Sequence, residues 1–372
     1  FVEALMKAQF ITLEGLIKRY KMLDSEDPMI LEYGFRINNH DGAYYVKFNN
    51  REVIEEKLSY FIQSRKGQYY HITSKEIYLS PSIFREQYGR EIQQEIKKYW
   101  GKHTLLSIIL KETKEKNSQY IFEQLGDNFE KLLDWLKCLS VWCKGYSSET
   151  AHISIPFKFM TNLSQGRIKK ADINELEMCQ DALNRFFTSL YSDIKLVLYH
   201  RKDLEDKVEY QLYFRKQIDG KVIEVPVSQE STGTRKLLQI FPVLFASCAG
   251  KTVAVDEIDS GIHDLLMEEV LESLIESLSG QLIITTHNTL LMRTLAPENI
   301  YIICEDFDGH KQIGPISDSA LRIQRNNNIQ LRYFKGDYGG IPYVGDFDFG
   351  EISSELMERF HAFKHNDGGE EA

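Results

Sequence analysis

A short apolar stretch that ends in two adjacent carboxylates constrains the fold of this chain more than any other feature. Thr252 to Val255 is mostly β-branched, and Asp256 and Glu257 follow it directly. A strand that is buried on both faces of a parallel sheet has this continuous apolar composition. Ligand sites in such sheets lie at the carboxyl ends of the strands. We therefore expect a parallel α/β sheet with the two acids at its ligand edge.

Two chemical roles are open to the acid pair. One carboxylate can hold Mg²⁺, which binds oxygen ligands, and the other can polarise a water molecule. The alternative is that the acids only end a strand and begin a turn. The pair alone does not decide between these interpretations, so the flanking sequence has to.

Composition limits the class of protein. The chain has 372 residues, a net charge of −10 and 27% charged residues, which is typical of a globular protein of about two domains. The acidic balance argues against a uniformly basic nucleic-acid surface but leaves room for a local patch. No apolar run of about 18 residues is present, and the five scattered cysteines form no CxxC pair. We expect a cytoplasmic protein without a membrane span or a zinc site.

The sequence pattern divides the chain into four parts. Residues 1–80 contain strand-like runs, with a hairpin turn predicted at Asp41-Gly42. Residues 81–190 have apolar residues at helical spacing and predict a helical insertion. Residues 191–325 alternate strands with helices, which indicates a parallel α/β sheet. Residues 326–372 form a tail rich in Gly, Tyr and Asp.

Small polar residues open a predicted helix just before the acid pair. Ser231, Thr232 and Gly233 precede an apolar helical pattern. Free N–H groups at a helix start attract phosphate, and a glycine lets an anion approach the backbone. The other interpretation is an ordinary helix whose N-cap is Ser231.

A histidine follows the next predicted strand after the acids. Leu282 to Thr286 is a β-branched run, and His287 comes at its carboxyl end. A lone histidine is usually structural. One that lies a single βαβ unit after paired carboxylates could reach a γ-phosphate or the attacking water.

This order of elements resembles the ABC-type ATPase family. The match covers about 60 residues, with four motifs in the family's order. It places the signature at Ser231, Thr232 and Gly233, the Mg²⁺-side Walker B acid at Asp256, the catalytic glutamate at Glu257, the D-loop at Asp259 and Ser260, and the switch histidine at His287. The signature reads Glu-Ser-Thr-Gly-Thr, which departs from the usual Leu-Ser-Gly-Gly form.

The resemblance implies a fold, cofactors and an assembly. The fold would be α/β, an ABC-type P-loop ATPase head with a mixed sheet, flanking helices and a β-meander, plus the helical insertion. The cofactors would be ATP and Mg²⁺. Two heads of the family sandwich the nucleotides, so a homodimer or higher even oligomer is expected. Nucleic acid is a possible partner, and a membrane is not expected.

The variant signature is similar to the predicted AAA ATPases near the overcoming-lysogenization-defect (OLD) proteins, many of which act in antiphage defence. The hairpin near Tyr33 to Leu58 and the tail from Arg332 to Pro342 resemble this branch more weakly. The leading functional hypothesis is a defence ATPase that controls a separate nuclease or toxin. The alternatives are a DNA-repair ATPase of the structural-maintenance type and a non-hydrolysing nucleotide-dependent scaffold.

The Walker A motif, Gly-x-x-x-x-Gly-Lys-Ser/Thr, does not occur in this sequence. Gly250-Lys251-Thr252 fails to match, because Phe245 stands where the first glycine is required. Phe1 to Leu5 resembles the helix that follows the P-loop in ABC-type ATPases. We expect the P-loop to precede Phe1, and the alternative is a pseudo-ATPase without one.

Three other groups suit ligand binding less well than they suit plain surface. His361 and His365 are four residues apart on a predicted helix, beside Glu358. The remaining groups are Asp346 with Asp348, and the basic cluster of Arg167, Lys169 and Lys170.

Overall fold

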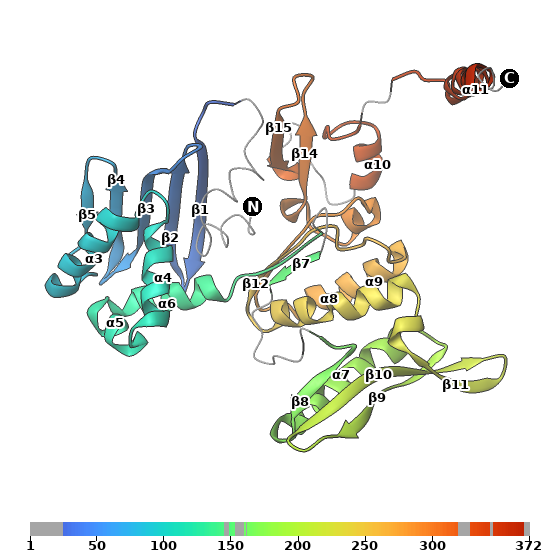
Figure 1. The fold of residues 1–372 in the computed structure, drawn as a ribbon, viewed down its shortest axis with the longest axis horizontal. Helices are drawn as coiled ribbons and strands as arrows, with labels where there is room; N and C mark the ends of the chain where they lie inside the picture. Colours follow the sequence, from blue (N-terminus) through green and yellow to red (C-terminus); the bar gives the residue numbers. More distant parts are fainter. Residues whose placement is uncertain are drawn as a thin grey trace. The chain divides into compact units, whose positions relative to one another are not determined.

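The computed structural model describes residues 25–144, 149–152, 160, 162–318, 328–342 and 345–367 (Figure 1). Two compact units divide the chain, Phe1–Asn288 and Thr289–Ala372. The helix expected at Phe1 to Leu5 lies outside the described residues. In the described part of the chain, no helix is long and apolar enough to cross a membrane.

The first unit begins with a five-stranded antiparallel meander in the order β1-β2-β3-β4-β5. Its strands are β1 (Met29–Ile37), β2 (His40–Phe48), β3 (Val53–Ile62), β4 (Arg65–Thr73) and β5 (Ile77–Leu79). Alternate residues of β1 are buried and exposed, as expected for a sheet with one covered face. The predicted β-meander is therefore present.

The first hairpin turns three residues earlier than the sequence indicated. Asn38 and Asn39 form the turn with φ angles of 51° and 62°. A two-residue hairpin of this kind needs two positive φ values, and asparagine tolerates them. The predicted Asp41-Gly42 turn is wrong because Gly42 lies inside β2, opposite Phe35. The Phe35 ring occupies the place of a Gly42 Cβ, 2.1 Å from its ideal position.

Four helices follow the meander and share its apolar core. They are α3 (Glu86–Tyr99), α4 (Leu105–Glu115), α5 (Ser118–Gln124) and α6 (Asp127–Lys137). Large side chains from both layers are fully buried, including Tyr69 of β4 and Phe129 of α6, whose ring centroids are 5.5 Å apart. The helical prediction for this stretch is confirmed as far as α6.

A buried carboxylate joins the meander to these helices. Glu56 of β3 has no exposed surface. Its Oε2 atom accepts hydrogen bonds from Trp100 Nε1 at 2.9 Å and from the Leu105 backbone N–H at 2.7 Å. Its Oε1 atom accepts from the hydroxyls of Tyr70 at 2.9 Å and Tyr44 at 3.2 Å. Burial raises the pKa of Glu56, and the hydrogen bonds from the Leu105 N–H and its other donors oppose that rise.

A second sheet forms the centre of the unit, with strand order β13-β12-β6-β7. Its strands are β6 (Ser140–Lys144), β7 (Glu149–His152), β12 (Thr252–Val255) and β13 (Gln281–Ile284), and the helices between them in sequence include α8 (Thr232–Cys248) and α9 (Asp264–Ile275). The β12 strand pairs in parallel with both β13 and β6, whereas β7 is antiparallel to β6. The predicted mixed sheet with a buried acid-bearing strand is confirmed.

The range 81–190 is not helical throughout, which corrects the helical insertion expected there. It contains β6, β7 and β8 (Gln165–Lys169), and β6 belongs to the central sheet beside β12. The β6 sequence is only five residues long and follows the helical apolar pattern of α6 without a break. A short apolar run of this kind cannot be told from a buried helix by periodicity alone.

Gly280 controls the approach of β13 to β12. A Cβ atom at this position would lie 2.2 Å from the Lys251 backbone oxygen. Because backbone cannot move aside as a flexible side chain can, we expect Gly280→Ala to lower the free energy of unfolding by about 2–4 kcal/mol. Gly34→Ala is the matched control, since nothing lies within 4 Å of its ideal Cβ. Urea denaturation of both variants checks this, and equal stabilities would contradict it.

A third sheet completes the first unit. It contains β8, β9 (Ile194–Asp203), β10 (Lys207–Ile218) and β11 (Lys221–Pro226), all joined through β10. Asp219 and Gly220 form the predicted turn between β10 and β11, with φ angles of 49° and 75°. The side chains of Asn184 and Gln180 in α7 (Ile173–Leu190) accept hydrogen bonds from backbone N–H groups of β9.

The second unit is small. It contains the hairpin of β14 (Tyr301–Glu305) and β15 (Lys311–Pro315), followed by α10 (Ile329–Phe334) and α11 (Phe349–Asp367). Tyr333 of α10 donates a hydrogen bond to the Gly340 carbonyl at 3.2 Å, and Gly340 packs against Ile302 of β14. These contacts hold the glycine-rich segment 336–340 to the hairpin.

Candidate active site

The acid pair lies at the carboxyl end of the central strand. Asp256 and Glu257 follow β12, which has a parallel neighbour on each side. The Asp256 backbone N–H donates to the Trp142 carbonyl of β6 at 2.8 Å. Both acids are half-buried. The predicted position of the pair at the edge where parallel strands end is confirmed.

Thr285 connects the two acids. Its hydroxyl donates to Asp256 Oδ1 at 2.6 Å and accepts from the Glu257 backbone N–H at 2.8 Å. Thr285 was not among the site residues predicted from the sequence. In the sequence, one feature alone could have indicated a role for Thr285. It has a hydroxyl and directly follows a strand that is parallel to the acid-bearing strand. Thr285 holds one carboxylate oxygen of Asp256 in place. The other oxygen of the same carboxylate can bind a cation.

Glu257 has a backbone conformation that is uncommon for a residue with a side chain. Its φ angle is +47°, and a left-handed conformation of a non-glycine residue costs about 1–3 kcal/mol. The surrounding loop holds it there. The Glu257 carbonyl accepts from the Ser260 N–H at 3.0 Å, and the fully buried Ile258 donates its N–H to the Thr285 carbonyl at 3.2 Å. Conformations of this kind cluster at functional sites, so the strain supports a role for Glu257.

The start of α8 meets the loop after the acids. A Cβ atom on Gly233 would lie 3.0 Å from the Gly261 carbonyl oxygen. Gly261 has a φ of +79°, and its own ideal Cβ would be 3.4 Å from the Thr232 methyl carbon. The predicted signature and D-loop segments therefore touch within one chain. Two glycines are needed because the two backbones approach so closely.

Ser231 is the N-cap of α8, as the interpretation of this segment as an ordinary capped helix predicted. Its hydroxyl accepts from the Thr234 N–H at 3.2 Å and contacts the Thr234 hydroxyl at 2.9 Å. Capping does not exclude a second partner, because a serine hydroxyl has two acceptor sites and one donor. Ser231 and Thr232 are both exposed and remain accessible.

His287 lies in the loop that also carries Thr285. This loop leaves the carboxyl end of β13, and Asn288 closes it by donating its N–H to the Thr286 hydroxyl at 2.9 Å. His287 is exposed. The structure thus places it on the same edge of the sheet as the acids, two residues beyond the threonine that binds Asp256.

A buried lysine packs behind the site. Lys236, one turn into α8, is only 7% exposed, and its Nζ lies 4.9 Å from the centroid of the Trp142 ring. Trp142 also holds the Asp256 backbone. This cation–π contact therefore links the helix start to β6, the strand that pairs with the acid-bearing β12. Neither residue stood out in the sequence.

The minor candidates have structural explanations or lie on exposed surface. Asp348 caps the start of α11, since its Oδ1 accepts from the Gly350 and Glu351 N–H groups at 2.7 and 3.2 Å. Arg167 forms an exposed ion pair with Glu209 at 2.8 Å. His361 is exposed on α11, and the side chain of His365 lies outside the described part.

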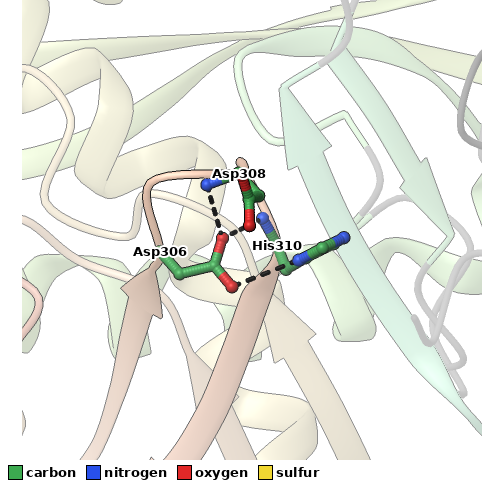
Figure 2. A group of neighbouring side chains, drawn as sticks. All are labelled: Asp306, Asp308 and His310. Carbon is green, nitrogen blue, oxygen red and sulfur yellow. Dashed lines mark hydrogen bonds and ion pairs between the residues drawn. The ribbon is translucent and has the colours of Figure 1, made fainter.

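One further group of potential metal ligands occurs in the β14–β15 turn (Figure 2). Asp306, Asp308 and His310 are exposed and place their ligand atoms within 4.8 Å of one another. The Asp306 carboxylate accepts the Asp308 and His310 backbone N–H groups at 3.0 and 2.8 Å and contacts His310 Nδ1 at 3.1 Å. These bonds lower the pKa of Asp306, and the hydrogen bond from the His310 backbone N–H has the largest effect. The cluster is explained by the closure of this turn.

One family model matches the part of the chain that contains the acid pair. Residues 148–293 match the family model described as an AAA domain, putative AbiEii toxin, Type IV TA system. This match supports an AAA-family ATPase domain over these residues. The AAA domain contains α8, both glycines that pack together, the acid pair, Thr285 and His287. The search of curated proteins found no match.

Among solved structures, the chain aligns with the Smc head domain with an extended coiled coil, bound to the C-terminal domain of ScpA, from Pyrococcus furiosus. The identity is 12%, the TM-score is 0.37, and the alignment covers 84% of this chain and 85% of that chain. The fold described above rests on the strands and helices of this chain themselves.

The hydroxyl of Thr285 provides a direct test of the site. Thr285→Val keeps the shape but leaves the Asp256 oxygen and the Glu257 N–H without their partner. We expect nucleotide turnover to fall about 10- to 100-fold, because one charge-assisted hydrogen bond is lost from a positioned carboxylate. Thr285→Ser retains the hydroxyl and should keep most of the activity. Equal turnover in the Val and Ser variants would contradict this role.

Proposed function

We propose that this protein binds Mg²⁺ and ATP at the edge of the central sheet and hydrolyses ATP. The observation that supports the proposal most is the Asp256–Thr285–Glu257 arrangement at the end of β12, within the AAA domain. Asp256 fits a magnesium ion held largely through water and phosphate oxygens, since Mg²⁺ in such sites uses one or two carboxylates. Glu257 accepts a proton from the attacking water as that water adds to the γ-phosphorus and ADP leaves.

The start of α8 supplies part of the phosphate cradle. Ser231 and Thr232 are exposed and Gly233 is half-buried at a helix N-terminus, where the dipole favours anions. Asp259 and Ser260 lie in the loop that packs against this start. We propose that these residues face a γ-phosphate bound by a second copy, which makes the active form a homodimer or a higher even oligomer. His287 senses the same phosphate.

A phosphate-release assay tests hydrolysis. ATP turnover by this protein should require Mg²⁺ and disappear with excess EDTA, because the metal neutralises charge on the β- and γ-oxygens. Parallel reactions with GTP determine the nucleotide preference. Nucleotide binding without turnover in Mg²⁺ would instead support the alternative of a non-hydrolysing scaffold.

We propose a biological role in antiphage defence, as a cytoplasmic sensor that controls a separate nuclease or toxin. The matched family is described as a putative AbiEii toxin of a type IV toxin–antitoxin system, which supports a role in such conflict systems. We also propose that this protein belongs to the branch of predicted ATPases near the OLD proteins. A DNA-repair ATPase is the second candidate, and it predicts turnover that is stimulated by DNA.

Phage challenge separates these roles. Cells that carry the natural gene with its flanking genes should show plaque counts reduced at least about 100-fold relative to cells in which the Glu257→Gln variant replaces the natural gene. Affinity capture during infection should recover the effector. Unchanged plaque counts together with DNA-stimulated ATP turnover would support the repair function instead.

A further inference from the structure

A buried ion pair joins the third sheet to the start of α8. Glu230 directly precedes Ser231, the N-cap of α8, and the Glu230 side chain is only 3% exposed. Lys216 of β10 donates to Glu230 Oε2 at 3.1 Å. The Lys216 Nζ atom also lies 3.0 Å from Asp193 Oδ2, in the turn that precedes β9. One lysine therefore holds two acids from different segments, and one of these acids adjoins the helix start that is proposed to meet phosphate.

The third sheet directs this lysine toward its covered face. Alternate residues of β10 from Val208 to Phe214 are buried, and Lys216 continues that alternation. The register of β10 against β9 shifts between Arg215 and Lys216, as at a β-bulge. Bulges change the direction of a side chain and are common beside active sites. A charged group at a covered position needs an ionic partner, and Glu230 and Asp193 supply it.

A second contact links the same regions. Tyr191 follows the end of α7, and a hydrogen bond between its side chain and that of Thr234 opposes the rise in the pKa of Tyr191 that burial causes. Thr234 is 2% exposed, and its hydroxyl lies 2.9 Å from the Ser231 hydroxyl. The residue before Ser231 and the residue three positions after it are therefore both held by the segments that form the third sheet and its helix.

The charge of Glu230 would oppose phosphate binding if it were unpaired. A helix N-terminus attracts anions, and a carboxylate one residue before the N-cap adds negative charge beside that site. Lys216 places a positive charge next to the carboxylate and so offsets this effect. The usual Leu-Ser-Gly-Gly signature has no acid at this position, so the need for a paired lysine comes with the variant signature of this chain.

We propose that Lys216 and Glu230 are positioning residues that fix Ser231 against the γ-phosphate held by a second copy. Through this pair, the third sheet controls how well the start of α8 engages the nucleotide of the neighbouring subunit. This inference rests on the proposed function. The pair acts in the copy that supplies Ser231, whereas Glu257 acts in the copy that holds the nucleotide. Loss of the pair should therefore impair turnover without weakening nucleotide binding to the same chain.

Substitutions at Lys216 test this role. Lys216→Met keeps most of the side-chain length but leaves Glu230 unpaired, so kcat for ATP should fall at least about tenfold. The affinity for ADP, which lacks the γ-phosphate, should stay within about twofold of the wild type, which also shows that the variant is folded. Lys216→Arg keeps the charge and should retain most of the turnover. Arg167→Met is the matched control, because it breaks only the exposed Arg167–Glu209 pair of the same sheet.

A mixing experiment separates this role from a simple loss of stability. Lys216→Met and Glu257→Gln chains should each be strongly impaired alone. A mixed pair has one complete site, with Glu257 from the first chain and an intact start of α8 from the second. Mixing the two variants before ATP is added should therefore raise turnover at least about fivefold above either variant alone.

The wild type distinguishes failure of this role from failure of the proposed function. If the wild type hydrolyses ATP and Lys216→Met is equally active, the positioning role is overturned. Hydrolysis by the wild type without any recovery on mixing overturns it as well. If the wild type does not hydrolyse ATP, the proposed function fails, and the positioning role fails with it.

Discussion

Replacing Glu257 with glutamine should reduce ATP turnover about 100- to 1,000-fold while nucleotide binding persists. The amide cannot accept the proton of the attacking water, but it keeps the size of the side chain. The left-handed backbone at residue 257 and its bond to Thr285 do not depend on the carboxylate. Binding and folding should therefore survive the change.

The measurement combines phosphate release with the oligomeric state in ATP. Because hydrolysis is blocked, we expect the variant to accumulate in the nucleotide-bound assembly. Glu269→Gln is the matched control, since Glu269 is an exposed acid on α9 and should leave turnover within about twofold of the wild type. Unaltered turnover in Glu257→Gln would remove the residue from the catalytic role.

Glu56→Ala should have the largest effect on stability. The change removes the carboxylate that accepts hydrogen bonds from Trp100 Nε1 and the Leu105 N–H. Buried tyrosine hydroxyls also lose this acceptor, and the missing side chain leaves a cavity. We expect a loss of about 3–5 kcal/mol in the free energy of unfolding. Urea denaturation followed by tryptophan fluorescence measures this loss.

The neighbouring residue is the control for Glu56. Glu55 points to the other face of β3, where it is partly exposed and pairs with Lys57 and His71. Because solvent screens that pair, Glu55→Ala should cost less than about 1 kcal/mol. Similar losses in the two variants would show that the buried network of Glu56 does not hold the meander to the helices.

The pH dependence of Glu56 has a definite sign. Its pKa is raised in the folded state, mainly by burial, so the folded protein binds this proton more tightly than the unfolded chain does. The stabilisation from the bound proton is complete below the ordinary value near 4.5 and is lost as pH rises through the folded pKa. Relative to the wild type, Glu56→Gln should therefore look least stable at acidic pH.

The sequence predicted the central strand and the position of its acids for a local reason. A strand covered on both faces must be apolar, so the run from Thr252 to Val255 indicates burial, and the polar residues after it must lie at the sheet edge. The helix start at Ser231 was predictable for a similar reason, because capping chemistry is written in adjacent residues. The turn at Asn38 and Asn39 was missed because Asp41-Gly42 is an equally good local turn signal.

Tertiary structure decided what depends on partners distant in sequence. The acids became a joined site only because parallel pairing of β12 and β13 brings Thr285, 28 residues beyond Glu257, to both of them. Likewise, the sequence shows two adjacent glutamates at 55 and 56, and strand register alone buries the second. Local sequence fixes chain conformation and burial pattern, whereas register and packing select which polar groups meet.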